Sequence, residues 1–566
     1  MVGKKSFWLI VMLLLIGNLL SSCNEENGNE ATAPERENEV EEGAGELDEE
    51  QVLNIVEGSE IPAMDSVMAE DVTSFNILTN VNEGLYRLDQ ENIAEPAMAE
   101  GEPEVSEDGL TYTFTLRDAN WSDGTPVTAQ DFVFSWQRAV DPATGSPYGP
   151  YMMAGTIKNA AAIAEGSMDK AELGIEATDD KRLVVTLERP VPYFLSLMSF
   201  PTFFPQKEEF FTEKVETYAS NSDNLLYNGP FMLENWDGTG LTWSMQKNPE
   251  YWDAETVKLE TINVDVVKEV STGVNLYTSG KKDSVLLSGE FAKQYAEDPD
   301  LVKRLTPAIF YLKYNQERNG EKTPLSNLNI RKAISIAFNK QDLADTILAD
   351  GSLPANYLVP AEFTFDENQE DFREVNGDMN EFNLEEAKQL WAAGLEEEGL
   401  TEADFEFLLD DTSDSKTLGA YMKSQLEGNL EGLTVNLNIV PFSVRLERDQ
   451  AQDYDIQFSG WGPDYQDPMT FIDLFVTDSA LNKMSYSNPE FDALIESAKG
   501  ELTQNLPARW EAMAQAEKIL IEEDAAIGPV FQEGTMSLVK PYVKDVVRHS
   551  FGSEFGFKWA YISGKE

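Results

Sequence analysis

The chain has 566 residues, too many for one hydrophobic core, and this length predicts two or more lobes. Its 102 Asp and Glu residues against 42 Lys and Arg residues give a formal net charge of −60. Nucleic acids and anionic membrane surfaces bind through basic patches, so this charge excludes both as main partners.

The amino terminus predicts export. Lys4 and Lys5 precede an apolar run over residues 7–20, which is too short to span a bilayer comfortably and ends before small residues. We therefore expect a signal peptide over residues 1–22. The sequence LSSC at residues 20–23 resembles the bacterial lipobox, which implies that Cys23 becomes the acylated first residue and anchors the protein on the extracytoplasmic face of the cell membrane. An uncleaved anchor helix is the alternative.

Residues 23–50 are rich in Glu, Asn, Gly and Ala and poor in large apolar residues. Such a composition cannot bury a core. This segment is predicted to be a disordered acidic tether.

The folded part is predicted to begin with a strand over residues 53–56. Apolar residues then alternate over 110–117, which predicts a half-buried strand, and a capping box at residues 128–131 predicts the start of a helix. Trp121 and Trp136 lie in or beside these regular elements. We expect both to be core residues rather than ligand contacts.

Residues 310–315 read as an extended crossover, and residues 328–338 as the first helix of a second lobe. Helices and strands alternate up to residue 525, and residues 527–531 return the chain to the first lobe. This pattern predicts an α/β protein. We expect a first lobe over 51–308 and 526–566, with 53–82 and 207–308 as its core and 83–206 as an extra subdomain, and a second lobe over 309–525.

The stretch from residue 454 to 475 reads as a strand, a loop and a helix, because Gly and Pro interrupt residues 460–468. The loop gathers two aromatic residues, two carboxylates and two glycines, which suits a small cationic or peptidic ligand. These residues are Gly460, Trp461, Gly462, Asp464, Tyr465 and Asp467. An acidic surface turn with Trp461 and Phe471 as core anchors is the alternative.

One cysteine and one histidine leave little material for catalysis or metal binding. Zinc sites and Ser-His or Cys-His catalysis need several such residues close together, and Cys23 and His549 lie at opposite ends of the chain. An enzyme would have to use Asp464, Asp467 or Asp473 as a paired acid and base. We expect no enzyme activity, no cofactor and no metal site.

A family resemblance rests on six motifs in order. They are SGWGPDYQDPMTF (459–471), ANWSDGTPVTAQDFVFSWQR (119–138), VPYF (191–194), NGPF (228–231), NPEYW (248–252) and NIRKAI (329–334). Together they resemble the extracytoplasmic oligopeptide-binding proteins of ABC importers. The resemblance implies a two-lobed periplasmic-binding-protein fold of class II, with an extra subdomain and a two-strand hinge. It also implies an oligopeptide ligand, an ABC transporter permease as partner and a monomer.

The resemblance also implies roles for single residues. Asp464 would bind the ligand ammonium, and Gly460 and Gly462 would offer backbone. By position, Glu70 and the backbone of Val72 match residues beside the ligand; a surface helix start at residues 69–71 is the alternative. Further positions that match ligand contacts are Trp461, Tyr465, Tyr148, Phe442 and Phe458.

Three positions depart from the enteric branch of the family. Phe458 stands where that branch has Arg, Gly462 where it has Cys, and Phe442 where it has Trp. These changes leave open the ligand's length and the residue that pairs with its carboxyl end. Arg445, Arg448 and Lys416 are candidates for that role, although each is more typical of a solvated surface residue. An oligosaccharide, nickel or haem ligand on the same fold is the alternative.

Overall fold

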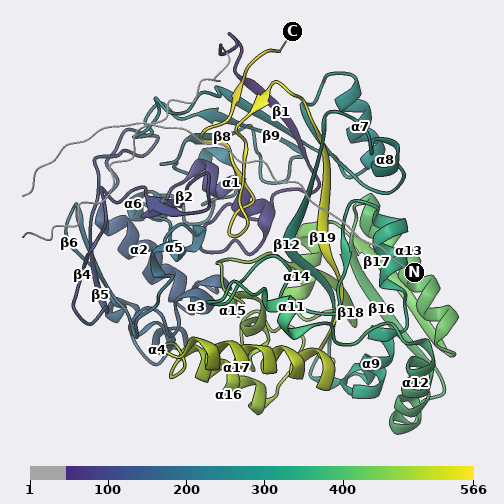
Figure 1. Ribbon diagram of the computed structural model, residues 1–566. Helices are drawn as coiled ribbons and strands as arrows, with labels where there is room; N and C mark the ends of the chain where they lie inside the picture. Colours follow the sequence, from purple (N-terminus) through teal and green to yellow (C-terminus); the bar gives the residue numbers. More distant parts are fainter. Residues whose placement is uncertain (1–45, 566) are drawn as a thin grey trace, which may run out of the picture. The chain divides into compact units, whose positions relative to one another are not determined.

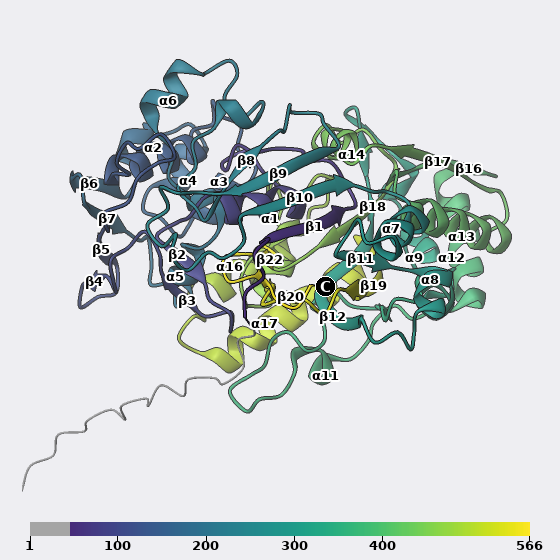
Figure 2. The same cartoon turned by 90° about the horizontal axis from the view of Figure 1, so that it is seen from above.

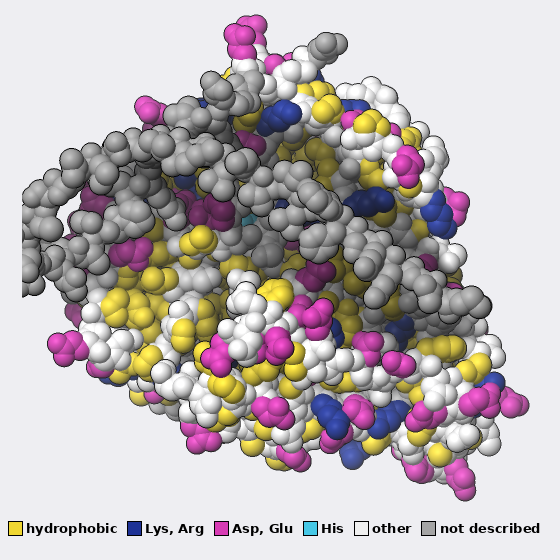
Figure 3. All heavy atoms as spheres, in the orientation of Figure 1, with side chains coloured by type: hydrophobic (Ala, Val, Ile, Leu, Met, Phe, Trp, Pro, Cys, Tyr) yellow, Lys and Arg dark blue, Asp and Glu magenta, His cyan; other side chains and the backbone are white. Residues whose placement is uncertain are grey.

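The computed structural model describes residues 46–565, and these residues form one compact unit. The predicted signal peptide, Cys23 and most of the predicted tether lie outside the described residues. Within residues 46–565, no helix combines the length and the apolar character needed to cross a membrane. Acidic side chains are spread over the visible face (Figure 3), in keeping with the net charge of −60.

The first half of the chain contains two four-stranded sheets. One has the strand order β1-β10-β9-β8 and the other the order β4-β5-β7-β6. The bounds in the first sheet are β1 (Val52–Glu57), β8 (Phe231–Glu234), β9 (Thr242–Lys247) and β10 (Thr261–Val266). Those in the second sheet are β4 (Glu104–Val105), β5 (Thr111–Thr115), β6 (Ile175–Asp179) and β7 (Arg182–Thr186). The second sheet lies wholly within the predicted extra subdomain.

Helix α2 (Ala129–Val140) packs against β6. Its predicted capping box is present, and the carboxylate of Asp131 accepts a hydrogen bond from the Thr128 backbone nitrogen at 2.9 Å. The same carboxylate accepts from the indole nitrogen of Trp121 at 3.2 Å. Trp121 and Trp136 are both fully buried, so their prediction as core residues is confirmed.

The second half is built on a seven-stranded sheet with the order β11-β19-β12-β18-β16-β17, to which β15 adds beside β19. Its strands are β11 (Ser284–Leu287), β12 (Leu301–Tyr314), β15 (Leu353–Pro354), β16 (Ala403–Asp410), β17 (Leu433–Val440), β18 (Ile456–Trp461) and β19 (Ile527–Val539). The helices named below in this half are α9 (Leu328–Ile336), α12 (Leu384–Glu398), α13 (Ser413–Asn429), α14 (Phe442–Gln450), α15 (Met469–Ile472), α16 (Pro489–Lys499) and α17 (Leu506–Lys518).

Strands β12 and β19 connect the two halves and run side by side through the middle of the molecule (Figure 1). They pair antiparallel from Leu301 with Leu538 to Lys313 with Ile527, with a register shift between Leu305 and Ile309. The predicted crossover and return segments are therefore the two long strands. The seven-stranded sheet continues through both strands, so it marks no boundary between lobes at residue 308 or 526. The division at these residues stays a prediction.

Several helices of the second half begin at residues whose side chains cap them. Asn383 accepts a hydrogen bond from the Glu386 backbone nitrogen at 3.3 Å and starts α12, and Asn488 and Asn505 cap α16 and α17. Such caps satisfy backbone N–H groups that the first helical turn leaves unpaired. Helices α9, α12 and α13 pack with β16 and β17 around a buried apolar core. The turned view shows these elements grouped together (Figure 2).

Residues 46–50, which we predicted to be the end of the tether, contact the carboxyl end of the chain instead. The backbone nitrogen of Asp48 donates to the Ile562 carbonyl at 3.1 Å, and the Asp48 carboxylate accepts from the Lys565 backbone nitrogen at 2.7 Å. These hydrogen bonds fix residues 46–50 on the folded unit, whereas the composition of this segment predicted disorder.

Candidate functional site

Strand β18 has one paired edge and one partly open edge. Along one side it pairs with β12 from Ile456 to Trp461, whereas β16 pairs on the other side only with Ile456 and Gln457. Within the described part of the chain, no strand pairs with the second edge from Phe458 to Trp461. Unpaired N–H and C=O groups on such an edge can accept another strand.

Asp464 lies just beyond this edge and is 7 % exposed. Its backbone nitrogen donates to the Thr470 hydroxyl at 2.9 Å, which fixes the loop, while its Oδ2 is buried without a hydrogen-bond partner. Burial, together with the charge of Asp473, holds the pKa of the Asp464 carboxyl well above its ordinary value, although the Tyr148 and Tyr151 hydroxyls act in the opposite direction. Ionising this buried carboxyl is costly, and a cationic ligand beside it would offset that cost.

The other carboxylates of the loop region already have partners. Asp467 binds the guanidinium of Arg509 through two hydrogen bonds of 2.7 and 2.9 Å. Asp473 lies 2.5 Å from the ammonium of Lys499 and accepts from the Tyr151 hydroxyl at 3.2 Å. Asp464 is therefore the carboxylate of this loop that is left to receive a positive charge.

Aromatic rings from the predicted extra subdomain face the loop. Trp461 stacks on Tyr148 and meets the edge of Tyr151, both on α3 (Tyr148–Met153), at centroid distances of 6.1 and 6.3 Å. Tyr465 stacks on Tyr193 at 4.8 Å with an interplanar angle of 4°. The structure thus brings the predicted residues Trp461, Tyr465 and Tyr148 together beside Asp464.

The two glycines differ. A Cβ at Gly460 would lie 2.6 Å from the Phe310 ring, whereas a Cβ at Gly462 would meet nothing within 4 Å. Packing inside the protein therefore requires Gly460. Packing does not require a glycine at position 462, and the space around Gly462 is open to the backbone of a ligand.

The side chains of Phe458 and Phe442 make internal contacts. Phe458 is 6 % exposed and packs with Phe310 and Phe531, at centroid distances of 5.4 and 6.1 Å. Phe442 is half-buried under the guanidinium of Arg445, 4.9 Å from the ring centroid. The Phe458 side chain is therefore part of the core, and its backbone carbonyl accepts from the Arg445 guanidinium at 3.3 Å.

Glu70 and Val72 flank the start of α1 (Val72–Val81). Asp71 caps this helix by accepting from the Ser74 backbone nitrogen at 2.9 Å. The Glu70 carboxylate lies 2.7 Å from the ammonium of Lys483 in the second half of the chain, and the Val72 side chain is exposed. Glu70 is therefore neutralised by the protein itself.

Comparison with known proteins decides the family. Residues 94–483 match the bacterial extracellular solute-binding proteins, family 5 middle region. A dipeptide-binding protein of Lactococcus lactis is 35% identical over 89% of this chain and 93% of its own length. The chain belongs to solute-binding protein family 5.

Two further relatives agree. The dipeptide-binding protein DppE of Bacillus subtilis is 33% identical over 98% of this chain and 99% of its own. The structure of Listeria monocytogenes OppA bound to peptide superposes with a TM-score of 0.89 at 47% identity, covering 92% of this chain and all of that one. The two-lobed α/β fold predicted from the motifs is thereby confirmed.

Sequence reasoning missed several residues that pack at this candidate site. The backbone nitrogen of Gly552 donates to the Pro463 carbonyl at 2.8 Å, so the segment near the carboxyl end reaches the loop, and neighbouring Phe551 is buried. Tyr151 and Lys483 were also missed. Tyr151 follows Tyr148 by three residues, a helical spacing that places both on one face and that we overlooked.

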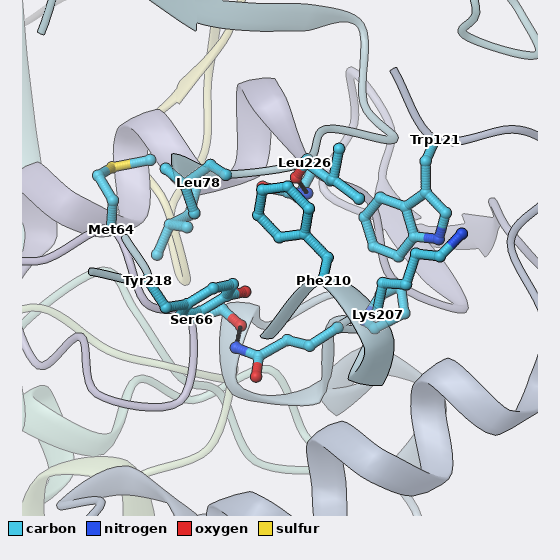
Figure 4. Close-up of a pocket in the computed structure, with 12 residues that line it drawn as sticks. Met64, Ser66, Leu78, Trp121, Lys207, Phe210, Tyr218 and Leu226 are labelled. Carbon is cyan, nitrogen blue, oxygen red and sulfur yellow. Dashed lines mark hydrogen bonds between the residues drawn. The ribbon is translucent and has the colours of Figure 1, made fainter. Parts of the chain in front are cut away.

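Two hollows are defined within the described residues. One lies within the first half, where Leu78, Trp121, Phe210 and Tyr218 line it (Figure 4). The other lies at the register shift of the hinge strands and includes Gln466 of the loop. None of the predicted site residues lines either hollow.

Proposed function

We propose that this protein is a lipid-anchored extracellular binding protein that captures oligopeptides between its two lobes and delivers them to the permease of an ABC transporter. The observation that carries the proposal is Asp464. It is buried, it has no cationic partner among the described residues, and it lies at the end of an open strand edge. A peptide supplies both missing partners, an ammonium for the carboxylate and main-chain groups for the strand.

The remaining contacts suit a ligand of variable sequence. Main-chain pairing along residues 458–461 is independent of the ligand's side chains. The aromatic rings of Trp461 and Tyr148 offer apolar surface that accepts many side chains. The names of the Lactococcus lactis and Listeria monocytogenes relatives support peptides as the ligand class.

Anchoring is the part of the proposal that rests on sequence alone. The lipobox-like LSSC places an acyl chain on Cys23, and residues 24–45 would then separate the folded unit from the membrane. Cys23→Ala should release the protein from the cell surface into the medium. A variant that stays with the membrane to the wild-type extent would point to an anchor helix instead.

Native mass spectrometry of the purified protein tests the ligand class, since a ligand enclosed between two lobes survives isolation. We expect added masses that fragment into peptides, and we expect Asp464→Asn purified in parallel to have lost them. A haem or oligosaccharide mass on the wild-type protein would contradict the proposal.

A further inference from the structure

A lysine from the first half of the chain lies between carboxylates of both halves. The Lys268 ammonium is 3.0 Å from the Glu60 carboxylate in its own half and 2.7 Å from the Asp411 carboxylate in the second half. We call these three residues the lysine bridge. Although burial acts to lower it, the bonds to Asp411 and Glu60 raise the pKa of the Lys268 ammonium above its ordinary value. The side chain is therefore charged at neutral pH.

The sheets explain why these residues meet. Strands β1 and β10 pair in parallel, and Glu60 and Lys268 lie just beyond their carboxyl ends. Strands β16 and β17 also pair in parallel, and Asp411 directly follows β16. The carboxyl ends of two parallel strand pairs, one from each half, therefore face each other. The lysine bridge lies between them.

Hydrogen bonds from backbone nitrogens join the halves at the same place. The Ser413 backbone nitrogen donates to the Lys268 carbonyl at 2.9 Å. The backbone nitrogen and the hydroxyl of Ser443, near the start of α14, both donate to the Glu60 carboxylate, at 3.3 and 3.2 Å. Because these amides are bonded across the junction, their exchange with solvent reports on separation of the halves.

The net charge gives the lysine bridge its importance. Both halves are rich in Asp and Glu, so their approach brings like charges together. Without the ammonium between them, Glu60 and Asp411 would face each other as two negative charges. Lys268 replaces this repulsion by attraction to both carboxylates, and the attraction to Asp411 exists only while the halves are in contact.

A second lysine has a similar position. The Lys483 ammonium is 2.7 Å from Glu70 of the first half and 3.6 Å from Asp449 of the second. Glu70 is a predicted ligand contact, so a change at Lys483 would also disturb the candidate site. The lysine bridge contains no predicted ligand contact, and its contribution can be measured separately from ligand binding.

Structures of one relative differ in how well they superpose on this chain. The structure of Escherichia coli MppA does so with a TM-score of 0.81, and that of MppA in an unliganded open form with 0.58, at 25% and 26% identity. The arrangement of the halves described here therefore differs more from the open form.

We infer that Lys268 is a positioning residue that holds the two halves together, so that the protein closes for part of the time even without ligand. Loss of its charge favours separation for two reasons. The attraction across the junction disappears, and the two carboxylates that it leaves behind repel each other. This inference rests on contacts within the protein, so it does not depend on the ligand class in the proposed function.

Small-angle X-ray scattering and amide hydrogen exchange of the full chain, after any bound ligand has been removed, test this inference. Lys268→Gln should have a larger radius of gyration than the wild type. Its Ser413 and Ser443 amides should exchange about threefold faster or more, the scale on which charges of one ion-pair network couple. Amides within β16 should keep the wild-type rate, which distinguishes separation of the halves from a general loss of stability. Lys268→Arg keeps the charge and should resemble the wild type.

Lys247→Gln is the matched control, because Lys247 pairs with Glu260 at 3.5 Å within the first half. It should leave both measurements unchanged. Asp411→Asn breaks the lysine bridge from the second half and should also open the protein. The double variant of Lys268→Gln and Asp411→Asn should be no more open than Lys268→Gln alone, because both changes break one bridge.

A wild-type radius of gyration and wild-type exchange in Lys268→Gln would overturn the inference. Additive opening by the two changes would also overturn it, since the residues would then act separately. If Lys268→Gln does not fold, Asp411→Asn decides the question: a larger radius of gyration than the wild type supports the inference, and an equal one contradicts it.

Discussion

Trp461, the last residue of β18, stacks on Tyr148 of α3 with ring planes 11° apart. The two residues are more than 300 positions apart in the chain, one in the predicted second lobe and the other in the predicted extra subdomain. Their contact forms the aromatic wall beside Asp464. The indole nitrogen of Trp461 is buried without a partner in the described structure, so the ring is held by packing rather than by a hydrogen bond.

This stacking predicts that Trp461→Ala weakens peptide binding more than the loss of one apolar contact would. Aromatic pairs contribute about 0.5 to 1.5 kcal/mol beyond the area that they bury. Trp461→Phe keeps a ring and should lose less affinity than Trp461→Ala. Calorimetric affinities of the two variants provide the check, and equal losses would show that stacking is unimportant.

The raised pKa of Asp464 predicts a cost in stability for the protein without ligand. A carboxyl whose pKa is higher in the folded than in the unfolded state stabilises the fold at low pH. That contribution is lost as the pH rises from the unfolded pKa through the folded one. Asp464→Asn has no ionisable group at this position and therefore does not lose this stability. It should have a higher melting temperature than the wild type at neutral pH, and the difference in melting temperature should shrink in acid.

Thermal melting of both proteins between pH 3 and 8, after any bound ligand has been removed, measures this effect. A lower melting temperature for Asp464→Asn at every pH would mean that the carboxylate supports the loop.

The two loop glycines predict opposite effects for the same substitution. Gly460→Ala forces a Cβ against the Phe310 ring and should lower the melting temperature. Gly462→Ala has open space and should leave stability unchanged while weakening peptide binding at least tenfold, because the methyl group obstructs the approach of ligand backbone. Unchanged affinity in Gly462→Ala would remove this residue from the site.

Much of the fold follows from local signals in the sequence. The caps at Asn383 and Thr128 and the extended crossover into β12 depend on residues that are adjacent in the chain. Local chemistry decides such features, so the sequence alone suffices to predict them.

The arrangement of the candidate site could not be predicted from the sequence alone, because it depends on contacts between distant segments. The contact of Gly552 with Pro463, and that of Lys483 with Glu70, join segments far apart in sequence. The surface position that we considered more typical for Arg445 is wrong, since tertiary packing buries this residue. Residue type indicates which groups can bind a ligand, but only packing determines which of them remain without a partner.

The buried ion pair of Glu517 on α17 predicts a large effect on stability. It is fully buried, pairs with Arg373 at 2.5 Å, and accepts from the backbone nitrogens of Leu358 and Val359 at 2.8 Å each. Glu517→Ala leaves the arginine buried and unpaired, which should lower the free energy of unfolding by about 3 to 5 kcal/mol. Glu511→Ala on the same helix is exposed and serves as the control. Urea unfolding measures both, and similar midpoints would contradict the prediction.

The central claim is that Asp464 receives the ammonium of a peptide. Calorimetric titration of the wild type and Asp464→Asn with one peptide, in its free and its amino-acetylated form, tests this claim most directly. The account predicts that Asp464→Asn weakens the free peptide by about 2 to 4 kcal/mol and hardly changes the acetylated one, which binds poorly to both proteins. Equal losses for both forms, or an undiminished affinity of Asp464→Asn for the free peptide, would contradict it.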